Sequence, residues 1–302
     1  MTGGAATLLI GGSGFLGNSL ASAITASGRR VVVAGRQGFQ NFGEAAWRSI
    51  HQLDAGSIDS IVDLTHAWGQ PPEQSRLLAA ANLDLATRLN SRRYLFVSSG
   101  GAIYGEAEYL PIGEDAPLRP SSDYGLGKRA AEQEIGTRIV RDGLPGIIVR
   151  PGNAYGPGHR PDSGQGLVTA AFASALRGSP LTVFGDGGQV RDYIFIDDVA
   201  AGLIAALDRG KVGQAYNLGS GVGTSVRQLL DLVQGLAGPI AIDWQPGRAS
   251  DVSANILDSS LLADDTGWSA QVALPDGLKQ TWQSVRDRRP DGHGHAGHGW
   301  PP

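Results

Sequence analysis

The chain has 302 residues, a formal net charge of −4 and a pI near 5.8. This length is enough for one large domain or two smaller ones with buried cores, and the mildly acidic balance predicts neither a nucleic-acid partner nor a polybasic membrane surface. The absence of cysteine excludes disulfides, thiol catalysis and thiolate metal sites.

Apolar runs in the sequence are short, and none approaches the roughly 18 residues that a membrane-spanning helix needs. The chain begins Met-Thr-Gly-Gly-Ala-Ala and enters an apolar segment without the basic region that starts a signal peptide. We therefore expect a soluble, cytoplasmic protein with no membrane partner.

The first half of the chain alternates apolar runs with stretches of helical periodicity. The runs have the length of strands that are covered on both faces, and they lie at 6–10, 30–34, 60–64, 94–97 and 146–149. The helical stretches between them include 73–90 and 124–141. Residues 37–58 fit neither pattern, and a strand there would be short. The alternation predicts an α/β protein with a Rossmann-like, doubly wound parallel sheet.

A glycine loop follows the first strand directly and opens the first helix. It begins at Gly11 and reads Gly-Gly-Ser-Gly-Phe-Leu-Gly. Because the chain has 45 glycines, this spacing arises roughly once by chance, and its place between strand and helix is what favours dinucleotide binding. The helix N-terminus would then bind the phosphates. The residues that we expect to contact the cofactor here are Gly11, Gly14, Phe15, Leu16 and Gly17.

Arg36 follows the second strand, where an acidic residue usually binds the adenosine ribose of NAD and an arginine can accommodate the extra phosphate of NADP. An arginine in solvent, stacked loosely on the adenine, would tolerate either cofactor. The sequence therefore predicts NAD or NADP and leaves the choice open.

Tyr124 and Lys128 are four residues apart in a predicted helix, so their side chains share one face. A nearby ammonium favours phenolate and lowers a tyrosine pKa from about 10 towards neutrality. The pair would then serve as a proton acceptor and donor. The alternative is a surface helix with a solvated lysine.

Further motifs follow in order along most of the chain. They are Phe-Val-Ser-Ser-Gly-Gly-Ala-Ile-Tyr-Gly at 96–105, Arg-Pro-Gly-Asn-Ala-Tyr-Gly-Pro at 150–157, Phe-Gly-Asp-Gly-Gly-Gln-Val-Arg-Asp-Tyr at 184–193, Tyr-Asn-Leu-Gly-Ser at 216–220 and Arg-Ala-Ser-Asp at 248–251. With the glycine loop and the Tyr124–Lys128 pair, they resemble the extended short-chain dehydrogenases, and specifically the NAD-dependent epimerase/dehydratase family of nucleotide-sugar enzymes. The resemblance covers about residues 5–286.

The resemblance implies roles for individual residues. Tyr124 would be the catalytic acid and base, and Lys128 would bind the nicotinamide ribose and lower the tyrosine pKa. The other cofactor contacts implied are Leu64, Thr65, Ser98 and Pro151. The residues implied to bind the nucleotide diphosphate sugar are Ser99, Gly100, Asn153, Val183, Arg191, Arg248 and Asp251.

This chain departs from the family beside the tyrosine. The family commonly has a serine or threonine that hydrogen-bonds the reacting sugar oxygen, and that position falls on Gly100. Either Ser99 takes over this role, or water and the substrate do. Dehydratases that resemble this family have an acidic pair next along the chain, where this chain has Gly101 and Ala102. Dehydration is therefore disfavoured.

The domain organisation follows from the motifs and the composition. We expect a dinucleotide-binding domain at 1–165, to which part of 190–220 returns, a mainly substrate-binding α/β subdomain at 166–286 and a disordered tail at 287–302. The tail is rich in Gly, Pro and His and cannot form a core. Its histidines could hold a metal adventitiously, but we expect no functional metal site.

The function predicted from these observations is that of an NAD(P)-dependent nucleotide-sugar epimerase acting at C4. A transient 4-keto sugar would form and take the hydride back on its other face. Two alternatives stay open: a reductase of the same family that consumes NADPH, and a nucleotide-binding relative without catalysis. The resemblance also implies a homodimer packed through helices beside the active site.

Overall fold

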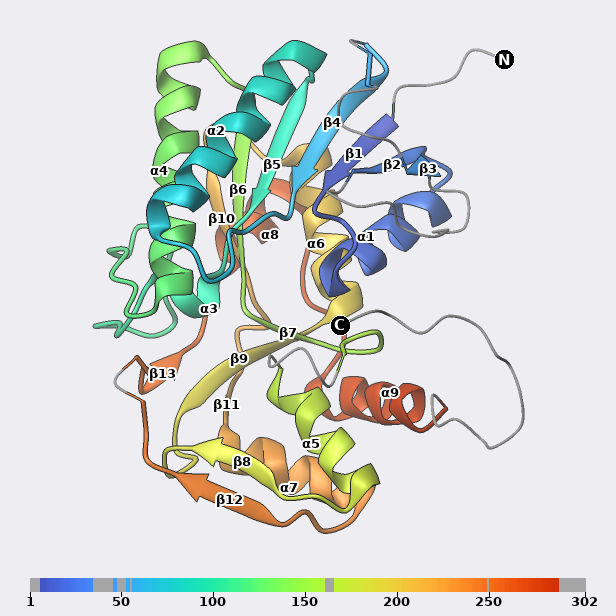
Figure 1. The fold of residues 1–302 in the computed structure, drawn as a ribbon, viewed down its shortest axis with the longest axis vertical. Helices are drawn as coiled ribbons and strands as arrows, with labels where there is room; N and C mark the ends of the chain where they lie inside the picture. Colours follow the sequence, from blue (N-terminus) through green and yellow to red (C-terminus); the bar gives the residue numbers. More distant parts are fainter. Residues whose placement is uncertain are drawn as a thin grey trace.

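The computed structural model describes residues 6–34, 46–47, 53–54, 56–160, 166–248 and 250–287. These residues form a larger part, built on one parallel sheet, and a smaller part below it in Figure 1. The chain crosses between the two parts several times, so neither is one continuous segment.

The larger part contains seven parallel strands in the order β10-β6-β5-β4-β1-β2-β3, counted over the described residues. Their bounds are β1 (Ala6–Ile10), β2 (Val31–Ala34), β3 (Ala46–Trp47), β4 (Ile58–Asp63), β5 (Arg93–Val97), β6 (Gly146–Pro151) and β10 (Ala215–Leu218). Every strand predicted from an apolar run is present, which confirms the Rossmann-like, doubly wound fold. In the segment before β4 that was hard to assign from the sequence, the described residues contain one strand, β3, which has two residues.

Helices cover both faces of this sheet because successive strand residues point to opposite sides. In β1, Leu9 packs in a cluster with α1 (Phe15–Ala26), α6 (Ile196–Arg209) and α8 (Ser260–Thr266). Its neighbour Leu8 packs on the other face, in a cluster with α2 (Pro72–Leu89) and α4 (Asp123–Asp142). Continuous apolar strands are therefore what this sequence needs to fill two cores.

The strand order reverses between β1 and β4. The chain leaves β1 through α1 towards β2 on one side, and β4 lies on the other. In open α/β sheets this reversal produces a crevice at the carboxyl ends of the strands, where ligands bind. The short helix α3 (Gly100–Ile103) begins at the same edge, three residues after β5.

The smaller part packs three helices against short strands (Figure 1). The helices are α5 (Leu167–Arg177), α7 (Val226–Ala237) and α9 (Leu274–Asp287). Strand β8 (Leu181–Phe184) pairs with β12 (Ile242–Gln245), while β9 (Val190–Phe195) pairs with β11 (Gly223–Ser225), β13 (Ala254–Asn255) and β7 (Asn153–Tyr155).

Two connections join the parts at β9. Strand β7 follows β6 of the large sheet and pairs with β9, and β9 runs without a loop into α6, which packs on α1. The chain then enters β10 at the edge of the large sheet. Residues 190–218 therefore connect the smaller part to the core of the larger one.

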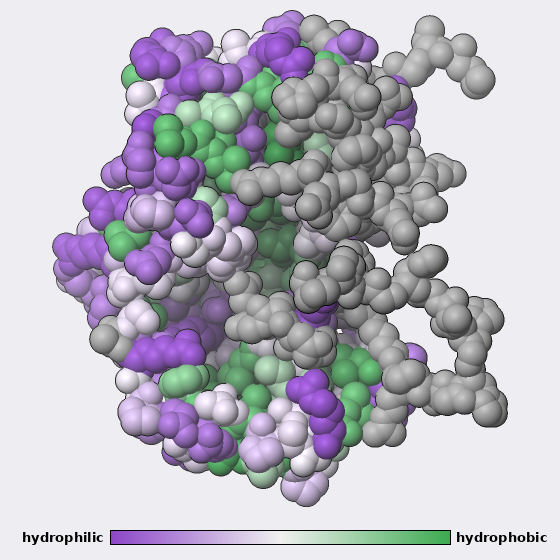
Figure 2. Space-filling view, viewed as in Figure 1, coloured by the Kyte–Doolittle hydropathy of each residue, from purple (hydrophilic) through white to green (hydrophobic). Residues whose placement is uncertain are grey.

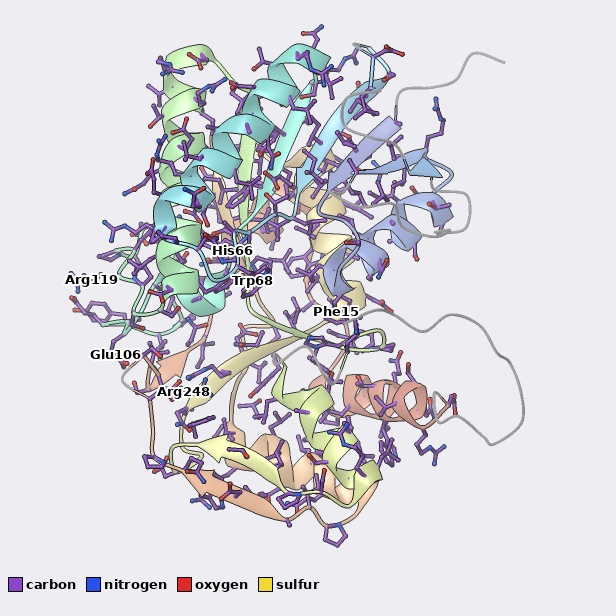
Figure 3. All side chains as sticks on the ribbon, viewed as in Figure 1. Phe15, His66, Trp68, Glu106, Arg119 and Arg248 are labelled. Atoms are coloured by element: carbon purple, nitrogen blue, oxygen red, sulfur yellow. The ribbon has the colours of Figure 1, made fainter. Side chains whose placement is uncertain are left out.

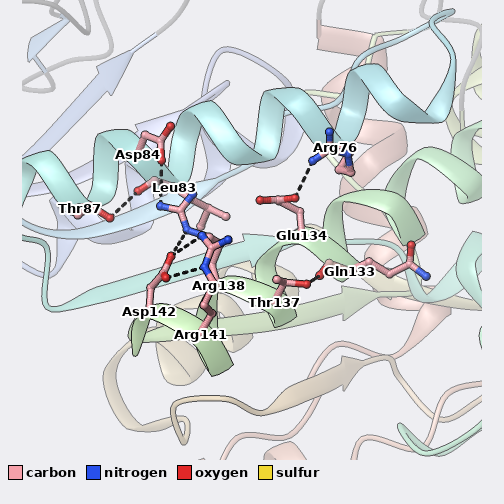
Figure 4. A network of polar contacts seen from close by, with 10 residues as sticks. All are labelled: Arg76, Leu83, Asp84, Thr87, Gln133, Glu134, Thr137, Arg138, Arg141 and Asp142. Atoms are coloured by element: carbon pink, nitrogen blue, oxygen red, sulfur yellow. Dashed lines mark hydrogen bonds and ion pairs between the residues drawn. The ribbon is translucent and has the colours of Figure 1, made fainter.

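Ion pairs join the outer sides of α2 and α4 (Figure 4). Arg76 lies 2.8 Å from Glu134, and Arg138 lies 2.9 Å from Asp84. Hydrophilic side chains cover much of this side of the molecule (Figure 2). Pairs of this kind contribute about 0–1 kcal/mol each, so the apolar contacts beneath them hold the two helices in place. No helix in the described part of the chain has the length and apolarity to span a membrane.

Two leucines of α7 test the importance of the smaller core. Leu230 is 1% exposed and belongs to this core, whereas Leu232 on the same helix is 37% exposed. We expect Leu230→Ala to lower the free energy of unfolding by about 2–5 kcal/mol, since it leaves a cavity. Leu232→Ala should change it by about 0.5 kcal/mol or less. Urea unfolding of both variants measures the difference, and equal losses would contradict the packing described.

Candidate active site

A cavity of about 700 Å³ lies at the carboxyl ends of the large sheet's strands, between the two parts of the molecule. It is lined by the glycine loop, by residues that follow β4, β5 and β6, and by the first turns of α4. The smaller part contributes Arg191, Tyr193 and Val226. Phe15, His66 and Trp68 lie between the two parts in Figure 3.

The glycine loop brings its backbone close to this cavity. Gly11 has a positive φ of +73°, and a Cβ atom on Gly17 would lie 2.2 Å from the carbonyl oxygen of Gly12. Only glycine fits at position 17. Helix α1 begins after Gly14 with no side-chain cap and no acidic residue in its first turn. Its N-terminal amide groups therefore offer an anion site, as predicted for a pyrophosphate.

Tyr124 and Lys128 lie on one face of α4, which Ser122 caps by accepting a hydrogen bond from the amide of Gly125 at 3.2 Å. Lys128 is buried, with 4% of the residue exposed. Its ammonium donates hydrogen bonds to the carbonyl oxygens of Thr65 (3.1 Å) and Val97 (2.8 Å). It thereby joins α4 to the ends of β4 and β5.

Burial changes the acidity of both groups. It lowers the pKa of Lys128 to about 8, against the opposing effects of Asp63 and Glu132. Burial raises the pKa of Tyr124, and a side-chain hydrogen bond with Ser99 lowers it. The expectation that Lys128 lowers the Tyr124 pKa is not met, because desolvation of the phenolate has the larger effect and the group that opposes it is Ser99.

Ser99 carries a hydroxyl next to position 100, where the family pattern expects one. Its side chain lowers the pKa of the Tyr124 phenol, and Ser99 is the N-cap residue of α3. A Cβ atom on Gly100 would lie 2.5 Å from Leu257 Cδ1 and 2.8 Å from the carbonyl oxygen of Arg150. A side chain at position 100 would force its neighbours to shift, which accounts for the glycine at this position.

Two aromatic residues beside Tyr124 were not expected from the sequence. The ring of His66 meets Tyr124 edge-on at 4.7 Å, and Trp68 stacks parallel to it at 5.0 Å (Figure 3). Burial, together with Lys128, lowers the pKa of His66 to about 4, so this imidazole is neutral at physiological pH. The sequence feature that could have indicated both residues is their position, three and five residues after the end of β4 at the ligand-binding edge.

The predicted cofactor residues lie along this edge in different ways. Leu64 and Ser98 line the cavity, while Thr65 turns its carbonyl to Lys128. Pro151 ends β6, next to the lining residue Gly152. Arg36 lies outside the described residues.

The predicted substrate residues divide into two groups. Asn153 and Arg191 line the cavity, and Arg191 donates to the carbonyls of Val190 (2.8 Å) and Val252 (2.9 Å). Val183 lies in the smaller core instead, away from this lining.

Arg248 and Asp251 form a turn that is not among the residues lining the cavity. The guanidinium of Arg248 lies 3.6 Å from the centre of the Phe184 ring. Asp251 accepts from the backbone amide of Arg248 at 3.0 Å. This bond holds the turn, and the aromatic contact fixes the direction of the guanidinium.

Several buried polar atoms of the cavity have no hydrogen-bond partner in the described part of the chain. They are Nδ1 of His66, Oγ of Ser98, Nδ2 of Asn153 and Nδ1 of His159. Buried polar groups rarely lack partners, so this lining fits a polar ligand. By contrast, no three metal-ligating side chains come together anywhere among the described residues, and the histidines of the tail lie outside them.

Comparisons with known proteins agree with this geometry. A family model described as the NAD dependent epimerase/dehydratase family matches residues 7–219. The UDP-glucose 4-epimerase of Mycolicibacterium smegmatis is 30% identical, over 93% of this chain and 99% of that protein. A solved UDP-glucose 4-epimerase of Thermotoga maritima with UDP-glucose is 28% identical, with a TM-score of 0.81 over 93% of this chain and 98% of that one. That of Thermus thermophilus with NAD is 26% identical, with a TM-score of 0.81 over 93% and 99%.

The two glycines after Ser99 give a matched test of the packing. Gly100→Ala places a methyl group against backbone and Leu257, whereas a Cβ atom on Gly101 meets Asn153 at an ordinary 3.5 Å. We expect Gly100→Ala to destabilise the protein by about 1–3 kcal/mol, as overpacking does, and Gly101→Ala to cost less. Thermal unfolding of both variants measures this, and a stable Gly100→Ala protein would refute the contact.

Proposed function

Because the chain belongs to the NAD-dependent epimerase/dehydratase family, we propose that it is an NAD(P)-dependent nucleotide-sugar epimerase acting at C4 of the sugar. The observation that carries the proposal is the group of three side chains at the sheet edge. Ser99 lowers the pKa of the Tyr124 phenol, and Tyr124 and Lys128 share one helix face and line the same cavity as the glycine loop.

The cavity fits a dinucleotide cofactor. The amide groups at the start of α1 would hold the pyrophosphate, and the unpartnered Ser98 hydroxyl and the Lys128 ammonium lie further along the same edge. When bound, NAD supplies the hydride acceptor and donor that the epimerisation needs. The family is NAD-dependent, and the Thermus thermophilus relative was solved with NAD. NADP remains the alternative, with Arg36 as its proposed contact.

The chain's own residues handle the proton. Tyr124 takes the proton of the sugar 4-hydroxyl during oxidation and returns it to the same oxygen during reduction. Ser99 lowers the pKa of the phenol and would hold the reacting oxygen beside it, and Lys128 would hold the nicotinamide ribose from the same helix face. His66 stays neutral, so it packs on the ring without competing for the proton.

The same edge argues against dehydration. Eliminating water from a sugar requires an acid that protonates the departing hydroxyl. In this chain the positions of that acid, directly after Gly100, are Gly101 and Ala102 in α3. Neither can donate a proton from its side chain, so the dehydratase reaction of this family is not our proposal.

Asn153 and Arg191 are the proposed anchors of the substrate diphosphate. Both line the cavity, and the Asn153 amide has a buried donor without a partner in the described residues. An arginine suits phosphate oxygens through its planar set of donors. The Thermotoga maritima relative was solved with UDP-glucose, which makes a UDP-sugar the first substrate to test. Arg248 and Asp251 would complete the anchor from the side of the smaller part.

We also propose a homodimer through α2 and α4. Their outer sides expose Leu77 and Leu126, which are 45% and 37% exposed. Light scattering on the purified protein measures its mass.

Tyr124→Phe removes the proposed proton acceptor and keeps the ring contacts. We expect turnover of a UDP-sugar to fall on the order of 10³-fold or more, while calorimetry shows unchanged affinity for UDP. Product analysis by NMR gives the rate. Absorbance at 340 nm separates the alternative, since a reductase would consume added NADPH stoichiometrically. A fully active Tyr124→Phe enzyme would rule out the mechanism.

Ser99→Ala removes the hydroxyl and should lower kcat on the order of 10²-fold, the usual effect of losing one transition-state hydrogen bond. Ser99→Thr keeps the hydroxyl and should restore most of the rate. The acid limb of the pH–rate profile should move to higher pH in Ser99→Ala, because Ser99 lowers the Tyr124 pKa. If the alanine and threonine variants lose equal activity, the hydroxyl has no role.

A further inference from the structure

Asp63 is a buried acid to which the proposed mechanism gives no role. It is the last residue of β4 and is 0% exposed, directly after the buried apolar residues Ile61 and Val62. Burying a carboxylate is costly unless hydrogen bonds compensate it. Its position at the ligand-binding edge points to a functional reason for burying this carboxylate.

The carboxylate of Asp63 accepts three hydrogen bonds. Its Oδ1 accepts from the amide of Thr65 at 2.8 Å, and its Oδ2 accepts from Nδ2 of Asn82 at 2.9 Å and from the hydroxyl of Tyr94 at 2.5 Å. Burial, with the charge of Asp63, raises the pKa of Tyr94, so this phenol keeps its proton and donates it. All three partners are neutral donors, which suits an ionised, acceptor-only carboxylate.

The backbone of Thr65 links this carboxylate to Lys128. Its N–H donates to Asp63, and its carbonyl accepts from the Lys128 ammonium at 3.1 Å. The hydrogen bond from Thr65 to Asp63 closes a turn over two residues, a recurrent way for an aspartate to fix backbone. Without this hydrogen bond, the Thr65 carbonyl that accepts from Lys128 would no longer be held in position.

The charges around Lys128 single out Asp63. On α4 itself, Tyr124 is a neutral phenol and Glu132 forms a buried, two-pronged ion pair with Arg150, at 3.0 and 2.7 Å. The negative charge of Glu132 is therefore largely balanced by its own partner.

The remaining groups come from the strands. After β4, His66 is a neutral imidazole. From β5, Phe96 offers its ring to the ammonium at 4.7 Å, and Tyr94 is neutral. Asp63 is thus the buried carboxylate near Lys128 whose hydrogen bonds, within the described part of the chain, come from neutral groups alone.

We propose that Asp63 is the positioning residue of Lys128: it holds the backbone of Thr65 against the ammonium and supplies the buried negative charge that balances it. The inference deepens the proposed function, because it rests on that function in giving Lys128 a catalytic role. Asp63 itself acts through Lys128 and does not reach the reacting atoms.

The test is a direct titration of Lys128 by NMR. The chain has only three lysines, Lys128, Lys211 and Lys279, so labelling lysine with ¹³C at Cε gives three signals, and a Lys128→Arg variant identifies the one that matters. In the wild-type protein we expect a midpoint of about 8. In Asp63→Asn we expect a midpoint lower by about 1 pH unit, the size of effect that one neighbouring charge has.

Asp192→Asn is the matched control. Asp192 is also 0% exposed and also accepts several hydrogen bonds, from Ser220, Gly221 and Leu257, but it lies within β9 of the smaller part. Both variants should lose thermal stability, and only Asp63→Asn should shift the Lys128 signal. If Asp63→Asn does not fold, Asp63→Ser also removes the charge and keeps an acceptor for Thr65, and the same shift is expected.

The outcomes separate this inference from the proposed function. An unchanged Lys128 midpoint in the folded Asp63 variant, or an equal shift in Asp192→Asn, overturns the role of Asp63 whether or not the protein is an epimerase. A selective shift supports that role even if no UDP-sugar is turned over. In an active enzyme, the alkaline limb of the pH–rate profile should move down with the NMR midpoint, because the ammonium is lost at lower pH.

Discussion

The burial of one ammonium group constrains the rest of this active site. Lys128 is taken out of water at the edge of the sheet, where an uncompensated charge would cost several kcal/mol. The carbonyl oxygens of Thr65, after β4, and of Val97, in β5, together with the ring of Phe96, replace its hydration. Helix α4 must therefore lie against the ends of β4 and β5 with Tyr124 one turn away. The position of the phenol follows from the requirements of the cation.

The fold supplies this arrangement through the reversal of strand order at β1 and β4. The same edge then carries the glycine loop on one side and the α4 face on the other. Strand β9 brings Arg191 from the smaller part, and because β9 continues into α6 its position is tied to the core of the larger part. Groups from three distant segments thus meet in one cavity without a long flexible loop among the described residues.

Sequence patterns predicted the sheet well because a strand buried on both faces must be apolar along its whole length, as in β1 and β6. The Tyr124–Lys128 pair and the glycine loop were predicted because their spacing is set by helix and turn geometry. Patterns left open whether Ser99 or another group provides the hydroxyl, because the crowding of Gly100 against Leu257 comes from residues distant in sequence. Nor could they assign Asp63, His66 and Trp68, whose roles depend on what packs around them.

The contact at Gly100 also limits the order in which this site can change during evolution. A serine at position 100 is reachable by single substitutions, yet it would collide with Leu257 and with the backbone of β6. Replacing Leu257 first would remove a fully buried side chain while gaining nothing for the site. Each step alone is unfavourable, so the two positions are epistatic. A lineage with glycine at position 100 is held there by packing, independently of how well a serine at that position would serve the chemistry.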